Sequence, residues 1–122
     1  DLAEANARLA ELQFAQTRER VELDVTRGRA ELERAQALYS ARRTNAAEAD
    51  EAFRLATLRY SRGLGTQLEV SDAQLARTTA QTNEARAIFD LYLAAAALAR
   101  ALGQPIPFPD RPWSPVTSIQ TR

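Results

Sequence analysis

The chain has 122 residues, enough for one domain, and 45% of them are apolar. Its 16 Lys and Arg residues balance 16 Asp and Glu residues, which excludes the basic surplus typical of nucleic-acid-binding proteins. Cysteine and histidine are absent, so thiolate ligands and an imidazole base are excluded, and we expect no metal, no cofactor and no enzymatic activity.

The first predicted helix covers residues 2 to about 62, which contain no proline and one glycine, Gly28. At 1.5 Å per residue it is roughly 90 Å long. Such a helix needs lateral partners, because helix propensity alone stabilises it little. Gly28 is either a tolerated substitution, which costs about 1 kcal/mol relative to alanine, or a site of close helix approach. Since the chain starts at Asp1 already in helical register, we expect it to be a piece of a larger protein.

A coiled-coil seam, a stripe of small or apolar residues at alternating spacings of three and four, begins at Leu32. Its members are Leu32, Ala35, Tyr39, Arg42, Ala46, Ala49, Phe53, Ala56 and Tyr60, of which only Arg42 is charged. Apolar side chains within residues 2 to about 26 precede the paired region, and we expect them to find no partner in the chain.

The next segment is predicted to reverse the chain at a tip, residues 63–66. Gly63 and Gly65 tolerate the positive φ with which a chain leaves a helix. Thr66 precedes Glu69 by three residues, which is the spacing of a capping box at the start of a new helix. We therefore expect a helical hairpin.

The second helix is predicted from about residue 66 to about residue 102, a length of roughly 55 Å. Two neighbouring seams run along it, and two seams on one helix indicate two neighbours. The first seam is Leu68, Ser71, Leu75, Thr78, Thr82, Ala85, Phe89, Tyr92, Ala96 and Ala99, and the second is Ile88, Leu91, Ala95, Leu98 and Leu102. Antiparallel pairing about the tip would place Leu32 or Tyr39 beside residues 89–99.

Gly103 follows the second helix, and five prolines after it exclude further helix. The predicted fold class is therefore all-α: a long antiparallel helical hairpin, a coiled coil, over residues 1–103. Residues 104–122 are predicted to form an extended or disordered proline-rich tail. No apolar run approaches the length that spans a bilayer.

The tip and its flanks resemble the TolC family of bacterial outer-membrane efflux proteins. Residues 59–74 read RYSRGLGTQLEVSDAQ. This run is similar to the family's pattern of Tyr, two residues, Gly, two residues, Thr, two residues, an acid and Val-Leu-Asp-Ala. The alanine-rich second helix, which ends in Ala-Leu-Gly at residues 101–103, is similar to the usual end of the family's repeat. The resemblance covers residues 1–103.

This resemblance implies the C-terminal hairpin of a periplasmic α-barrel, in which three protomers with two repeats each form a tunnel. The protein would lie in the outer membrane, as a homotrimer that works in multidrug efflux or type I secretion. Its tip, in the periplasm, would gate the tunnel and dock a periplasmic adaptor (membrane fusion) protein coupled to an inner-membrane pump. Tyr60 matches the family's gate tyrosine, Gly63 and Thr66 its tip motif, and Glu69 and Asp72 two acids that line the entrance.

Two positions depart from the family's pattern. Gly65 stands where the best-known member has a gate arginine, and Ser71 replaces the usual leucine. The resemblance therefore does not imply a constriction held by that arginine, unless Arg62 replaces it. Arg62 also has a structural interpretation, because a cation at the end of a helix is placed favourably against the helix dipole.

The acids of the tip have alternative roles. Glu69 and Asp72 share a helix face, and under threefold symmetry they would form stacked rings that favour cations. Glu69 could instead only close the capping box, just as Tyr60 could pack in the seam. Hydrolysis or a hard-metal site would need a third ligand or a base that the sequence lacks.

Two further expectations concern the chain as a whole. The alternative function is a non-channel coiled-coil interaction or adaptor module that shares the alanine-rich pattern. On its own, the chain is expected to self-associate, because two apolar seams are left uncovered.

Overall fold

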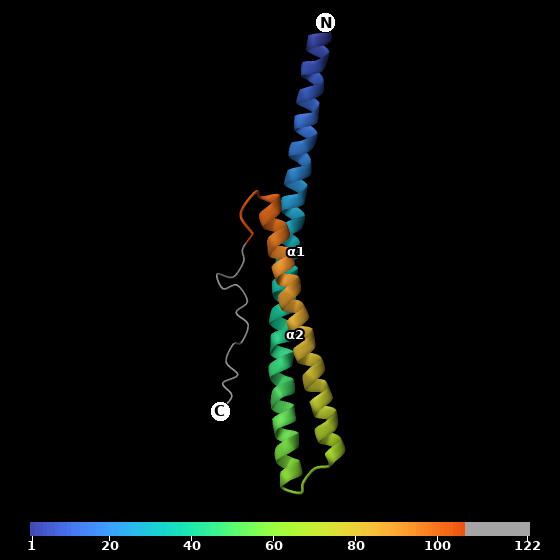
Figure 1. Cartoon of the computed structure of the whole chain (residues 1–122), viewed down its shortest axis with the longest axis vertical. Coiled ribbons are helices and arrows are strands. Elements are labelled where there is room, and N and C mark those ends of the chain that lie inside the picture. Colours follow the sequence, from blue (N-terminus) through green and yellow to red (C-terminus); the bar gives the residue numbers. More distant parts are fainter. Residues whose placement is uncertain (107–122) are drawn as a thin grey trace, which may run out of the picture.

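A computed structural model describes residues 1–106 and shows two long helices that pack as an antiparallel hairpin (Figure 1). Helix α1 spans Leu2–Ser61 and helix α2 spans Gln67–Ala101. The predicted all-α hairpin is confirmed. The predicted proline-rich tail falls mostly on residues 107–122, which lie outside the described residues, so the division of the chain after residue 103 stays a prediction.

The packing face of α1 agrees with the predicted seam and extends it towards the N-terminus. Tyr60 is the one predicted member that lies outside it, with 47% of the residue exposed. At the seam spacing, the buried and half-buried residues of α1 are Val25, Gly28, Leu32, Ala35, Tyr39, Arg42, Ala46, Ala49, Phe53 and Ala56.

The packing face of α2 differs from the first predicted seam, whose members from Leu68 to Tyr92 are exposed. The observed face lies two residues further along the sequence, which is about 200° around the helix. Its members are Val70, Ala73, Arg77, Ala80, Glu84, Ala87, Leu91, Ala94, Leu98 and Ala101. From Leu68 to Tyr92 the first predicted seam is thus not the contact with α1, although its last members, Ala96 and Ala99, are half-buried and buried. The second was partly right, since Leu91 and Leu98 lie on the observed face.

Small residues explain which face of α2 packs. The observed face carries an alanine every seven residues, at positions 73, 80, 87, 94 and 101. Alanines let two helices approach closely, whereas the larger side chains of the predicted seam would hold them apart. All the buried residues in the described part of the chain are alanines, namely Ala35, Ala46, Ala87, Ala94 and Ala99.

Gly28 lies where the two helices approach closely, near the open end of the hairpin. A Cβ atom at Gly28 would lie 3.2 Å from Cδ1 and 3.4 Å from Cα of Leu98, so the two helices approach closely at this point. The same antiparallel register places Leu32 level with Ala94 and Tyr39 level with Ala87, and large residues therefore face small ones. Of the two interpretations of Gly28, close helix approach is the one that the structure shows.

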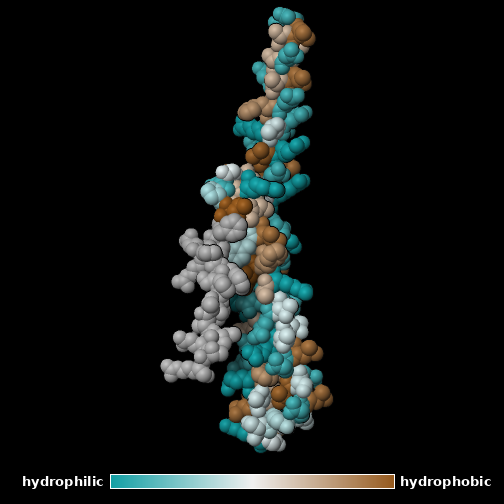
Figure 2. All heavy atoms as spheres, in the orientation of Figure 1, coloured by the Kyte–Doolittle hydropathy of each residue, from teal (hydrophilic) through white to brown (hydrophobic). Residues whose placement is uncertain are grey.

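The N-terminal part of α1 extends beyond the end of α2 (Figure 1). Every residue from 1 to 24 is exposed, including Leu2, Leu9 and Phe14, as the sequence predicts for the unpaired segment. Val25, which was also expected to find no partner, is half-buried on the packing face, so that part of the prediction was wrong. Figure 2 shows apolar side chains scattered along this arm and others near the tip. No helix among the described residues combines the length and hydropathy that a bilayer span requires.

Candidate functional site

The tip begins where α1 ends in a Schellman motif centred on Gly63. Gly63 has a φ of 72° and donates its N–H to the carbonyl of Tyr60 at 3.0 Å, and Leu64 donates to the carbonyl of Arg59 at 2.8 Å. These two bonds satisfy carbonyls that the end of the helix would otherwise leave free. No atom outside the neighbouring residues lies within 4 Å of the Cβ position at Gly63, so only the backbone conformation requires glycine there.

Helix α2 starts with the predicted capping box. The Thr66 hydroxyl oxygen accepts the N–H of Glu69 at 3.2 Å, and Oε2 of Glu69 accepts the N–H of Thr66 at 3.4 Å. Thr66 itself has extended backbone angles, φ −104° and ψ 157°, as expected of a residue that precedes the first helical turn. The structure confirms this part of the sequence analysis.

Gly65 has a steric role, and the prediction that it supplies a positive φ is wrong. Among the described residues only Gly63 and Gly103 have positive φ. A Cβ atom at Gly65 would lie 2.9 Å from Oε2 of Glu69, closer than such contacts normally occur. Glycine therefore leaves room for the carboxylate that closes the capping box. Sequence spacing could not show this, because it depends on Glu69 folding back over the loop.

The two acids of the tip have different surroundings. The Glu69 carboxylate is engaged with the loop backbone. Asp72, one turn further along α2, is exposed and forms no ion pair or side-chain hydrogen bond with any described residue. Both acids were predicted as candidate pore acids. In the structure only Asp72 has a carboxylate that faces solvent without a partner among the described residues.

Exposed side chains surround the loop. Leu64 and Leu68 are each 68% exposed, so two apolar side chains project from the tip. Arg59 donates from Nη2 to the carbonyl of Leu64 at 3.3 Å and thereby ties the loop to α1. The sequence predicted no role at the tip for Arg59 or Leu64, and it placed Leu68 only in a seam of the second helix.

The structure brings the predicted tip residues together in the last turn of α1, the loop and the first turns of α2. They are Tyr60, Arg62, Gly63, Gly65, Thr66, Glu69 and Asp72. Arg62 caps the C-terminus of α1 and is exposed, and no described residue forms an ion pair with it. The described residues contain no group of three or more His, Cys, Asp or Glu that could hold a metal ion. The tip thus offers a shaped surface with apolar and acidic side chains.

These features define a class of protein: a long antiparallel helical hairpin with an alanine-rich interface, a structured tip and further apolar faces without a partner. A family model described as Outer membrane efflux protein matches residues 1–104, and the chain belongs to this family. Searches of curated proteins and of solved structures gave no significant match.

Family membership confirms the resemblance seen in the sequence. It indicates a component of an outer-membrane efflux channel, in a family that consists of channel proteins and not of enzymes. Proteins of this family assemble into trimeric channels, and membership implies the outer membrane as the location.

Proposed function

We propose that the hairpin forms part of the periplasmic α-barrel of an outer-membrane channel, with its tip at the tunnel entrance. One observation carries this proposal: α2 has apolar side chains on two nearly opposite faces. The first contacts α1, and the second carries Leu68, Leu75, Phe89 and Tyr92, all exposed. A helix with an apolar stripe on each side is suited to a layer in which it has a neighbour on both sides.

The tip residues are suited to gating and docking. The Schellman motif and the capping box fix the loop from both ends, so that Leu64 and Leu68 project from a defined surface. Such a surface fits a helical hairpin of a periplasmic adaptor protein, which would link the channel to an inner-membrane pump in multidrug efflux or type I secretion. Tyr60 and Arg62, exposed beside the loop, would then face the neighbouring protomers of a homotrimer.

The acids of the tip would set the charge preference of the entrance. In the channel reconstituted in a planar bilayer, Asp72→Asn is expected to lower the preference for cations, because it removes a charge that has no internal partner. Glu69→Gln is expected to have a smaller effect, since the Glu69 carboxylate is held against the loop. Glu33→Gln, far from the tip, serves as the control. Unchanged ion selectivity in both tip variants would contradict a pore at this site.

Docking has its own test. Leu64→Arg changes the surface of the tip without altering a hydrogen bond of the loop, because Leu64 takes part only through its backbone. We expect this variant to lose cross-linking to the adaptor and efflux of the transported compound. A bulky residue at Gly63 should do the same by distorting the loop, and Leu102→Arg at the other end of α2 is the control. Intact cross-linking and efflux in both tip variants would argue against docking at the tip.

A further inference from the structure

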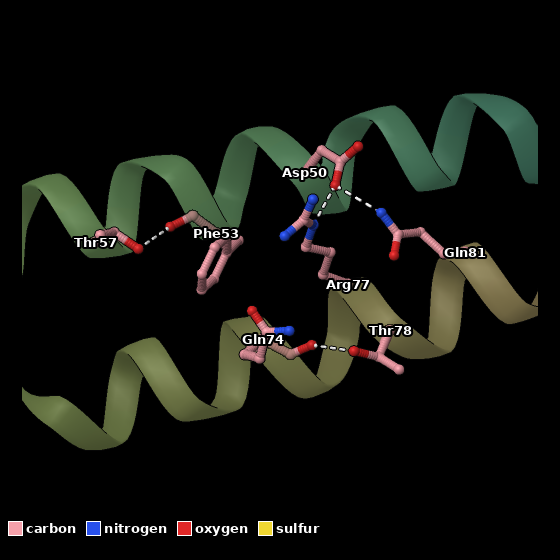
Figure 3. Close-up of polar contacts among 7 residues, drawn as sticks. All are labelled: Asp50, Phe53, Thr57, Gln74, Arg77, Thr78 and Gln81. Carbon is pink, nitrogen blue, oxygen red and sulfur yellow. Dashed lines mark hydrogen bonds and ion pairs between the residues drawn. The ribbon is translucent and has the colours of Figure 1, made fainter. Parts of the chain in front are cut away.

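A polar cluster joins the two helices in the half of the hairpin nearer the tip. Nε of Arg77 donates to Oδ1 of Asp50 at 2.5 Å, and Nε2 of Gln81 donates to the same oxygen at 3.1 Å (Figure 3). The Arg77 guanidinium carbon also lies 5.2 Å from the centre of the Phe53 ring. Within residues 1–106, the bonds to Asp50 are the only side-chain hydrogen bonds between α1 and α2. We refer to Asp50, Phe53, Arg77 and Gln81 as the interhelix cluster.

Arg77 occupies a position of the α2 packing face where most other members are alanine or leucine. Its side chain is 35% exposed, and that of Asp50 is 49% exposed. The aliphatic part of Arg77 therefore lies in the interface while its charged end reaches Asp50 at the edge. A charged residue in an alanine-rich seam stabilises little, but it favours the arrangement of the helices in which the charge meets its partner.

The packing differs on the two sides of the interhelix cluster. All five buried residues lie on the side away from the tip, between Ala35 and Ala46 in α1 and between Ala87 and Ala99 in α2. On the tip side, no described residue is buried. The residues of the packing faces there are only half-buried, namely Phe53, Ala56, Val70 and Ala73. The tip half therefore has little packing of its own to hold the helices at one separation.

We propose that the interhelix cluster is a conformational device that sets the separation of α1 and α2 in the tip half of the hairpin. With the cluster intact, α1 and α2 can separate only between the cluster and the loop, a length of roughly 20 Å at 1.5 Å per residue. Loss of either charge leaves the other partly buried in the interface without a partner, and the tip half then spreads. The device belongs to the hairpin itself and does not depend on the proposed channel function.

The test uses the full chain, which has no cysteine, so that spin labels attach only at introduced positions. One labelled pair, Thr57→Cys and Ser71→Cys, reports on the tip side, and another, Ser40→Cys and Arg86→Cys, reports on the other side. All four positions are exposed. Labelled chain is diluted with unlabelled chain, so that pulsed electron paramagnetic resonance measures distances within one hairpin.

Charge reversal provides matched variants. We expect Asp50→Arg and Arg77→Asp each to broaden the tip-side distance distribution and shift it to longer values, while the other pair stays unchanged. The double reversal should restore the parental distribution. Circular dichroism checks that each variant is helical, and if a reversal unfolds the chain, Arg77→Gln is measured in its place with the same expected shift.

Three results would overturn the proposal. The first is an unchanged tip-side distribution in the single variants. The second is an equal shift at both labelled pairs, which would mean that the cluster supports the whole hairpin. The third is a double reversal that fails to restore the tip-side distances.

Discussion

Gly65 lies against Glu69, and a side chain at position 65 would meet the carboxylate that closes the capping box. The Cβ position is 2.9 Å from Oε2 of Glu69, while Oε2 also accepts the N–H of Thr66. Glycine at 65 and the capping box therefore depend on each other. An arginine at this position would require the end of the flexible Glu69 side chain to shift and would thereby weaken the capping box.

The dependence predicts a specific energetic coupling. Gly65→Ala should lower the free energy of unfolding by about 0.5–1 kcal/mol more in the parental chain than in a Glu69→Ala background, because only the parental chain has a carboxylate to displace. Urea unfolding of the four chains, followed by circular dichroism, measures the difference. Equal effects of Gly65→Ala in both backgrounds would show that the two residues act independently.

The close approach at Gly28 predicts a steric limit in the middle of α1. Gly28→Leu should destabilise the hairpin by about 1–3 kcal/mol, the usual cost of overpacking a fitted interface. The reason is that the new side chain would meet Leu98, including its Cα atom. Ala37→Leu, at an exposed position of the same helix, is the matched control. Equal thermal stability of the two variants would mean that the helices do not approach closely at Gly28.

Two ion pairs on α1 predict a dependence of stability on pH. Arg34 lowers the pKa of Glu31, mainly through a hydrogen bond, and Arg54 lowers the pKa of Glu51 in the same way. A carboxyl whose pKa is lowered by folding adds stability above its unfolded pKa, about 4.3 for Glu. That stability is lost as the pH falls through the lowered folded value.

The measurement is the urea midpoint at pH 7 and at pH 3. The double variant Glu31→Gln with Glu51→Gln should lose less stability between pH 7 and pH 3 than the parental chain does. This difference between the two chains should shrink in high salt, because both ion pairs are exposed. Glu33→Gln changes an acid that forms no ion pair with any described residue and serves as the control. The same loss in all three chains would rule out a contribution from these pairs.

The exposed second face of α2 predicts self-association of the isolated chain. Leu75 is 68% and Phe89 63% exposed, and an apolar stripe of this kind favours contact with a second copy. Sedimentation equilibrium should show oligomers, and Leu75→Arg with Phe89→Arg should shift the equilibrium towards monomer. Leu55→Arg, at an exposed position of α1, is the control. A helical monomer at every concentration would contradict this prediction.

Local signals in the sequence predicted the hairpin and its loop well. The spacing of Thr66 and Glu69 predicts the capping box because both partners lie within one helical turn. Gly63 and Gly103 mark helix ends for a similarly local reason, since each takes the left-handed conformation that favours glycine. The seam from Leu32 to Ala56 was also predicted, because apolar and small residues coincide on one stripe of α1.

The packing of α2 could not be predicted in the same way. Its larger apolar residues, such as Leu75 and Phe89, form a regular stripe, yet the face that contacts α1 consists mainly of alanines and also includes Arg77 and Glu84. Hydrophobic periodicity identifies the stripe of larger residues, but it misses most of the alanine face and does not decide which face pairs with which neighbour. Periodicity also cannot predict the hydrogen bond between Arg77 and Asp50, because these residues lie on different helices. The steric fit of Gly65 likewise depends on how the Glu69 side chain folds back over the loop.

The most direct test of the central claim, a channel with this tip at its entrance, is cross-linking at Asp72 in the protein assembled in its membrane. Residues 1–122 contain no cysteine, so Asp72→Cys provides the only reactive site within them. If several hairpins converge on one axis, a short bifunctional maleimide should join subunits into covalent dimers, because each linker joins the single Cys of two subunits. Ser40→Cys, exposed on the shaft, is the comparison. Monomers alone at position 72 would contradict the entrance and favour a coiled-coil module outside a channel.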